Sequence, residues 1–123
     1  MIKGKLGDTL TVEEGYEAAR CCGIQILGTL HHYLEGDWSR IARFLKVVGF
    51  VNSTADFEDH PAVINGASDL FGQVFSTTTG GSSSGGSQNN DSVGRHARSA
   101  VGMQSLPMGI ATEVECIVEL KYQ

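Results

Sequence analysis

Residues 95–120 read RHARSAVGMQSLPMGIATEVECIVEL, and they contain two stretches that are typical of β-strands. The first runs from 95 to 103 and the second from 111 to 120, with the proline and glycine of a turn at 106–109 between them. In the second stretch, apolar residues alternate with Glu113, Glu115 and Glu119, which predicts one apolar face and one face rich in carboxylates. The two strands are compatible with a hairpin or with separate places in one sheet, and helices should cover the apolar face.

Two amphipathic helices are predicted upstream of these strands. Apolar residues recur at helical spacing from Val12 to Leu34, and Thr11 and Glu14 form the Thr-x-x-Glu pattern of a capping box. Gly36 is expected to end this first helix. The second helix is predicted to begin near Pro61, because proline suits the first helical position and the residues after it keep helical spacing.

Between the two helices, residues 41–51 (IARFLKVVGFV) form a nearly continuous apolar run. Such a run predicts a strand that is covered on both faces. The polar residues 52–56 are expected to end the strand. Asp56, Asp59 and His60 are expected to cap the second helix.

A chain of 123 residues predicts a single domain, residues 1–123, with one core. Residues 77–92 are almost entirely Thr, Ser, Gly and Asn, a composition that cannot bury apolar surface. We expect a flexible Ser/Gly-rich loop there, and its repetitive character leaves open whether it is natural or engineered.

The charge balance bears on which partners the chain can bind. Nine Lys and Arg residues against fourteen Asp and Glu residues give a net charge of −5, which disfavours nucleic acid because phosphate binding depends on clustered cations. No apolar run approaches the ~20 residues of a membrane span, and the first residues lack the apolar core of a signal peptide. We therefore expect a cytoplasmic protein with no membrane partner, whose three cysteines are reduced and mostly buried.

Most of the polar side chains that suggest chemistry have a simpler interpretation. His31 and His32 are adjacent on a helix and point apart, so we predict no metal site. Ser99 has no Ser-His-Asp context for nucleophilic catalysis. His96 is expected to be a polar strand residue near a pocket rather than a general base.

Arg98 and Glu113 are the stronger candidates. A guanidinium can bind a carboxylate through two parallel hydrogen bonds, and a carboxylate can position or deprotonate a water molecule. A simple hairpin centred on Pro107 would not set these two residues opposite each other, so their proximity does not follow from the strand register.

The chain resembles the Rid/YjgF family, the reactive intermediate (enamine/imine) deaminases. The resemblance is carried by the Ala-Arg-Ser segment within Arg95–Gly102, the Leu106-Pro107 turn, the strand Glu113–Val118, and upstream Gly49-Phe50-Val51, Asp56-Phe57 and Val63-Ile64-Asn65-Gly66. It covers most of residues 3–121 apart from the Ser/Gly-rich loop.

This resemblance implies an α+β fold of the chorismate-mutase-like (YjgF) type, in which two helices pack on one face of the sheet. It also implies a homotrimer whose sheets face a central barrel, with three sites at the subunit interfaces. The implied reaction is the hydrolytic deamination of small 2-imino or enamine acids to 2-keto acids and ammonia, without a metal or an organic cofactor.

The family's functional residues match four positions. Arg98 matches the arginine that binds the substrate carboxylate, and Glu113 matches the glutamate that holds the attacking water, so these two are the implied catalytic residues. Asn65 matches a polar residue near the substrate. Ala100 stands where the family often has cysteine, and only its backbone is available to the substrate.

One departure from the family pattern leaves a second hypothesis open. Family members begin with a strand pair that helps to wall the pocket, and this chain starts after that point. The alternative is a non-catalytic trimer that binds small carboxylates or supports an assembly, whereas the retention of Arg98 and Glu113 favours the enzyme. The ribonuclease or translation-inhibitor activity of some relatives is disfavoured by the acidic charge balance.

Overall fold

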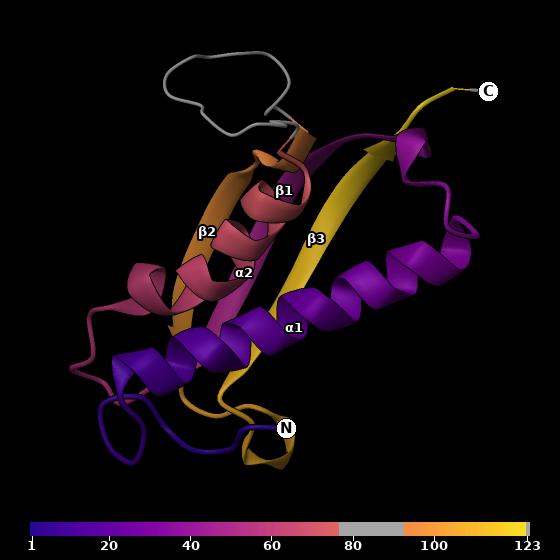
Figure 1. The fold of residues 1–123 in the computed structure, drawn as a ribbon. Coiled ribbons are helices and arrows are strands. Elements are labelled where there is room, and N and C mark those ends of the chain that lie inside the picture. Colours follow the sequence, from indigo (N-terminus) through magenta and orange to yellow (C-terminus); the bar gives the residue numbers. More distant parts are fainter. Residues whose placement is uncertain (77–92, 123) are drawn as a thin grey trace.

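The computed structural model describes residues 1–76 and 93–122, which form a three-stranded sheet with two helices on one face (Figure 1). The main elements in chain order are α1 (Val12–Tyr33), β1 (Ile41–Asn52), α2 (His60–Val74), β2 (Ala97–Met103) and β3 (Thr112–Leu120). Two short 3₁₀ turns, η1 (Trp38–Arg40) and η3 (Pro107–Gly109), precede β1 and β3. The predicted Ser/Gly-rich loop at 77–92 lies outside the described residues. The expected α+β class with helices on one face of the sheet is confirmed.

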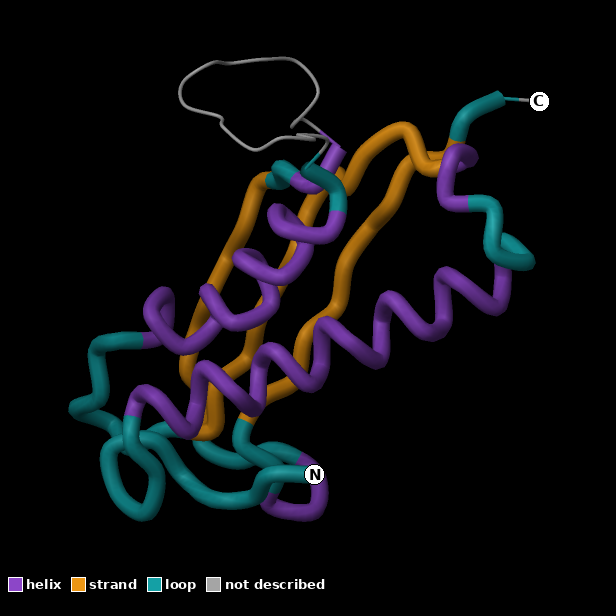
Figure 2. The backbone as a smooth tube through the Cα atoms, in the orientation of Figure 1, coloured by secondary structure: helices purple, strands orange, loops and turns teal. Residues whose placement is uncertain are grey.

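The sheet has the order β2-β1-β3, so β1 is the central strand (Figure 2). β2 runs parallel to β1, with α2 in the connection between them, and β3 runs antiparallel to β1. The hairpin interpretation of residues 95–120 is therefore wrong, because β1 lies between the two strands. A parallel pair needs a long crossover, and α2 provides it.

Side chains of β1 divide cleanly between the two faces of the sheet. Val47 and Val51 are fully buried beneath the helices, as is Phe44, whose ring centroid lies 4.6 Å from that of Phe71 on α2. On the opposite face, called the open face here, Val48 and Phe50 are only half-buried. The prediction that this strand is covered on both faces is thus wrong for the described chain.

The alternation predicted for the last strand is confirmed. Thr112, Val114, Cys116 and Val118 face the helices, where Thr112 contacts Cys22 and the other three pack against the core, while Glu113, Glu115, Ile117 and Glu119 are exposed on the open face. Arg43 of β1 pairs with Glu119 at 3.1 Å, with both side chains about half exposed. Such an exposed ion pair contributes little to stability.

Local signals fix the start of α1. The Thr11 hydroxyl accepts from the Glu14 backbone N–H at 3.1 Å, and the Glu14 carboxylate accepts from the Thr11 N–H at 2.9 Å. These two bonds satisfy amides that have no partner within the helix. The helix ends at Tyr33, and Gly36 follows with φ +81°, a conformation that favours glycine.

The start of α2 agrees with the sequence prediction only in part. Pro61 occupies the first turn as expected, but the N-cap Asp59 makes no side-chain capping bond. Asp56 instead accepts from the Thr54 hydroxyl, and His60 lies 3.3 Å from the Ser53 hydroxyl. The predicted side-chain capping by Asp56, Asp59 and His60 is therefore wrong, because each meets a different partner or none.

The two helices approach closely at glycine positions. A Cβ atom on Gly66 of α2 would overlap the backbone carbonyl oxygen of Tyr16 on α1, whereas a Cβ on Gly72 would meet nothing within 4 Å. Tyr16 also donates its hydroxyl to Asp69 of α2 at 2.8 Å. Backbone cannot move aside as a flexible side chain does, so the residue at 66 sets the distance between the helices.

Gly66→Ala should lower the free energy of unfolding by about 1–3 kcal/mol, the range for overpacking a close contact. Gly72→Ala is the matched control on the same helix and should raise it by about 0.5–1 kcal/mol, because alanine loses less backbone entropy than glycine. Urea denaturation of the three proteins measures both changes. Equal stability of the two variants would contradict the role assigned to Gly66.

Candidate functional site

Arg98 lies on β2, beside Val47 of the central strand, and its half-buried side chain points to the helix face. Its Nη1 atom donates to the Asn65 side-chain oxygen at 2.7 Å and to the Ser68 hydroxyl at 3.3 Å. Arg98 forms no ion pair with any carboxylate in residues 1–76 and 93–122. The structure therefore brings together Arg98 and Asn65, and it leaves the arginine's positive charge available to an anion.

His96 extends this network. Its Nδ1 atom lies 2.8 Å from the Gly94 carbonyl oxygen, and its Nε2 atom lies 2.9 Å from the Ser68 hydroxyl. A carbonyl oxygen can only accept, so Nδ1 carries the proton and Nε2 of the neutral ring accepts from Ser68. The sequence analysis did not identify Ser68 and assigned no partner to His96. Asn65 and Ser68 are three residues apart and so lie on one face of the helix, and this spacing is the sequence signal that could have pointed to Ser68.

Ala100 lies two residues further along β2, beside Gly49 on the helix face, and it is half-buried against the core. A methyl group offers no hydrogen bond, so the side chain can only pack. The helix face of β2 thus presents one charged side chain, Arg98, followed by a small apolar one.

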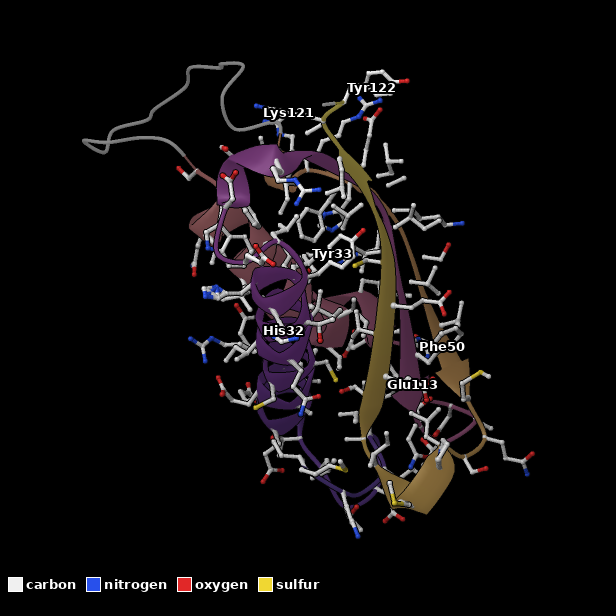
Figure 3. All side chains as sticks on the ribbon, turned by 90° about the vertical axis from the view of Figure 1, so that its right-hand side faces the viewer. His32, Tyr33, Phe50, Glu113, Lys121 and Tyr122 are labelled. Carbon is white, nitrogen blue, oxygen red and sulfur yellow. The ribbon has the colours of Figure 1, made fainter. Side chains whose placement is uncertain are left out.

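Glu113 lies on the other face of the sheet from Arg98. It is exposed on the open face of β3, opposite Phe50 of the central strand, and Figure 3 shows both residues on the side of the sheet away from α1. Two strand spacings and three residues along the sheet place the Cα atoms of Arg98 and Glu113 roughly 14 Å apart. Because their side chains also leave opposite faces of the sheet, one chain does not bring them together.

A groove of about 500 Å³ runs between α1 and β3. Its walls are mostly apolar and include Ile26 and Leu30 from the helix and Val114 and Val118 from the strand. Among the described residues, β3 has no strand partner beyond β1. The groove is separate from Arg98, since the central strand lies between β3 and β2.

Two half-buried cysteines line the groove, and the third is exposed. Cys22 contacts the Thr112 hydroxyl at 3.4 Å, while Cys21 points to solvent, so the prediction of mostly buried thiols fails at Cys21. Burial raises the pKa of the Cys22 thiol and the pKa of the Cys116 thiol. Both thiols are therefore held in the protonated form to a higher pH than an ordinary cysteine.

Neither a metal cluster nor a membrane helix is found in the part of the chain that the structure describes. There, no three His, Cys, Asp or Glu side chains converge as metal ligands would. His31, considered above for a metal site, stacks on Trp38 with ring centroids 5.5 Å apart. None of the described helices is long and apolar enough to span a membrane.

Two helices lie on one face of a mixed sheet, with a crossover helix between its parallel strands, and the high TM-scores of two solved structures support a YjgF-like fold of the chorismate-mutase-like type. No family model matches the chain. The solved structure of Atu1372, a protein with unknown function from Agrobacterium tumefaciens, is 36% identical with a TM-score of 0.83 and matches 98% of this chain and 68% of its own. The chain belongs to the same family as Atu1372.

Two further proteins are similar. TCP17 of Trypanosoma cruzi is 44% identical over 119 residues, which is 97% of this chain and 65% of TCP17. This chain therefore spans just under two thirds of the length of TCP17. The structure of a "putative endoribonuclease" from Shewanella oneidensis MR-1 is 28% identical with a TM-score of 0.80, over 98% of this chain and 69% of that protein.

Iodoacetamide at pH 8 should modify Cys21 about tenfold faster than Cys22 or Cys116, because burial limits access to these two thiols and raises the pKa of each. Mass spectrometry with fragmentation between the adjacent residues 21 and 22 follows each site. In urea all three should react at similar rates. Equal rates in the folded protein would contradict the burial of the groove cysteines.

Proposed function

We propose that the chain binds small carboxylates through Arg98 and that, as a homotrimer, it hydrolyses 2-imino acids to 2-keto acids and ammonia. The observation that carries the proposal is the half-buried guanidinium of Arg98, which is held by Asn65 and Ser68 and has no ion-pair partner among the described residues. A fixed guanidinium without its own carboxylate is suited to a carboxylate ligand.

The hydrogen bonds of Arg98 determine which edge of its guanidinium group is left for a ligand. Both acceptors found among the described residues lie at Nη1, which leaves the Nε and Nη2 groups for a substrate. Parallel N–H bonds from these two atoms match the two oxygens of a carboxylate. A lysine at this position would supply charge without that geometry.

The proposed reaction is a hydrolysis. The 2-imino acid reacts with its imine nitrogen protonated. Water adds to the imine carbon, the electrons of the carbon–nitrogen double bond move to nitrogen, and one water proton passes to Glu113 as the carbon–oxygen bond forms. Glu113 returns this proton to the nitrogen, the carbon–nitrogen bond breaks, and the hydroxyl proton is lost to the departing ammonia as the carbonyl forms, which leaves a 2-keto acid and ammonium. No electrons are transferred in these steps, so the reaction requires no redox cofactor.

Joint action of Arg98 and Glu113 requires more than one copy of the chain, because a single chain places them on opposite faces of the sheet. The open face favours such an assembly: Val101, Met103 and Ile117 are 42%, 39% and 59% exposed there. Apolar side chains gathered on one sheet face are typical of an interaction surface. A homotrimer with its sites between subunits would bring Arg98 of one copy near Glu113 of the next.

The separation of Arg98 from Glu113 also favours a second candidate function. If assembly does not bring Glu113 to the ligand, the chain is a carboxylate-binding protein without hydrolytic activity. Nucleic acid remains the poorer proposal, because the net charge of −5 opposes binding to a phosphate backbone.

The first test is ammonia release from enzymatically generated 2-iminopropanoate and 2-iminobutanoate. The chain should accelerate release, and Arg98→Ala should lower kcat/KM by about 100-fold, the cost of losing a charged bidentate contact. Arg98→Lys should recover little of this loss, and Arg20→Ala, an exposed arginine on α1, should retain full activity. Carboxylate binding without acceleration would establish the second candidate, and neither binding nor acceleration would overturn both.

The second test mixes two inactive variants. Arg98→Ala and Glu113→Gln chains are co-folded in equal amounts; if each site takes Arg98 from one copy and Glu113 from another, about a quarter of the sites should be intact. Activity should then exceed that of either variant alone, and each pure variant at the same total concentration is the control. Mixed assemblies as inactive as their parents would contradict a site shared between copies.

A further inference from the structure

We infer that His96 is a positioning residue that acts through Ser68 to hold Arg98 in its carboxylate-binding orientation. The inference rests on the carboxylate-binding part of the proposed function, and it concerns residues that orient the arginine rather than contact the ligand. It is carried by three consecutive hydrogen bonds, from Arg98 to Ser68, from Ser68 to His96, and from His96 to the Gly94 carbonyl.

The direction of each bond follows from the groups involved. The Gly94 carbonyl can only accept, so His96 Nδ1 donates to it, and in the neutral ring His96 Nε2 is then an acceptor. The Ser68 hydroxyl has one hydrogen, which it gives to Nε2, and its lone pairs are then left for the guanidinium. His96 thus draws the hydroxyl hydrogen of Ser68 away from Arg98 and leaves the lone pairs of the oxygen directed to the guanidinium.

This choice decides the orientation of the guanidinium. Nη1 carries two N–H groups, and the two acceptors on α2, Asn65 Oδ1 and Ser68 Oγ, can engage both. With both engaged, the planar group cannot turn about its Nε–Cζ bond without losing a hydrogen bond. The Nε and Nη2 edge therefore stays turned away from the two acceptors on α2.

The ring of His96 is itself held by the core. It meets the ring of Phe71 edge to face, with centroids 6.1 Å apart, and Phe71 is fully buried. Gly94 is buried against the Phe71 backbone, and a Cβ atom at position 94 would collide with the Phe71 carbonyl oxygen. The carbonyl that orients His96 thus comes from a segment with little freedom to move.

Ser68 and His96 have the hydroxyl–imidazole spacing of an activated serine, but the Ser68 oxygen is also the acceptor for Arg98. A donor on the serine oxygen withdraws the electron density that a nucleophile needs. A positioning role explains all three hydrogen bonds, whereas a nucleophilic role leaves the bond from Arg98 without a purpose.

The test compares two ligands that differ in charge. Isothermal titration of the full chain measures binding of 2-oxobutanoate and of its uncharged amide. His96→Ala should weaken 2-oxobutanoate binding about tenfold, the effect of one lost charge-assisted hydrogen bond, and should leave binding of the amide unchanged. His96→Gln should stay within about threefold of the native chain, because the Gln carbonyl oxygen can accept from Ser68 where Nε2 does.

A second measurement does not depend on ligand binding. In ¹⁵N NMR spectra, the Arg98 Nη signals should be separately resolved in the native chain and in His96→Gln, since rotation about Nε–Cζ is hindered, and they should merge in His96→Ala. Equal spectra in all three proteins, or equal loss of 2-oxobutanoate affinity in both variants, would overturn the role of His96. A native chain that shows the hindered rotation but binds no 2-oxobutanoate would instead overturn the proposed function and retain the positioning network.

Discussion

The parallel pairing of β1 with β2 is the constraint on which the rest of the structure depends. Parallel neighbours cannot be joined by a tight turn, so the chain must cross over one face of the sheet, and α2 is that crossover. The helix face of β2 is therefore the face that packs beneath α2, so a side chain on this face contacts residues of that helix. Arg98 contacts Asn65 and Ser68 for this reason, although more than 25 residues of chain separate β2 from these partners.

Features governed by neighbours in the sequence could be predicted, and those governed by strand order could not. The capping box at Thr11 and the helix start at Pro61 involve residues within one turn, and both were found from spacing alone. The separation of β2 from β3 was open, because their short connection suits a hairpin, and only the insertion of β1 between them excludes it. Asp59 has the residue type of a helix cap but not the geometry.

The same distinction between local features and features set by strand order applies to the candidate site. The family resemblance singled out Arg98 and Asn65, and the structure places them 2.7 Å apart. No local pattern links Ser68 to His96, because their contact depends on how α2 packs beside the start of β2. Glu113 was predicted on an acidic strand face, which is confirmed, yet its distance from Arg98 follows from the sheet order rather than from either motif.

In the proposed function, the placement of Arg98 and Glu113 on opposite faces of the sheet assigns carboxylate binding and hydrolysis to different surfaces. Among the described residues, the groups that orient Arg98 come from α2 and from residues 94–98 of the same chain, so the proposed carboxylate anchor would need only one folded chain. A water-positioning carboxylate beside the anchored ligand requires a second chain, because the sheet itself lies between Arg98 and Glu113. In the proposed trimer, the affinity for carboxylates would be a property of each subunit, and hydrolysis would be a property of the interface. Substitutions on the open face should therefore affect turnover through assembly and leave the geometry of Arg98 intact.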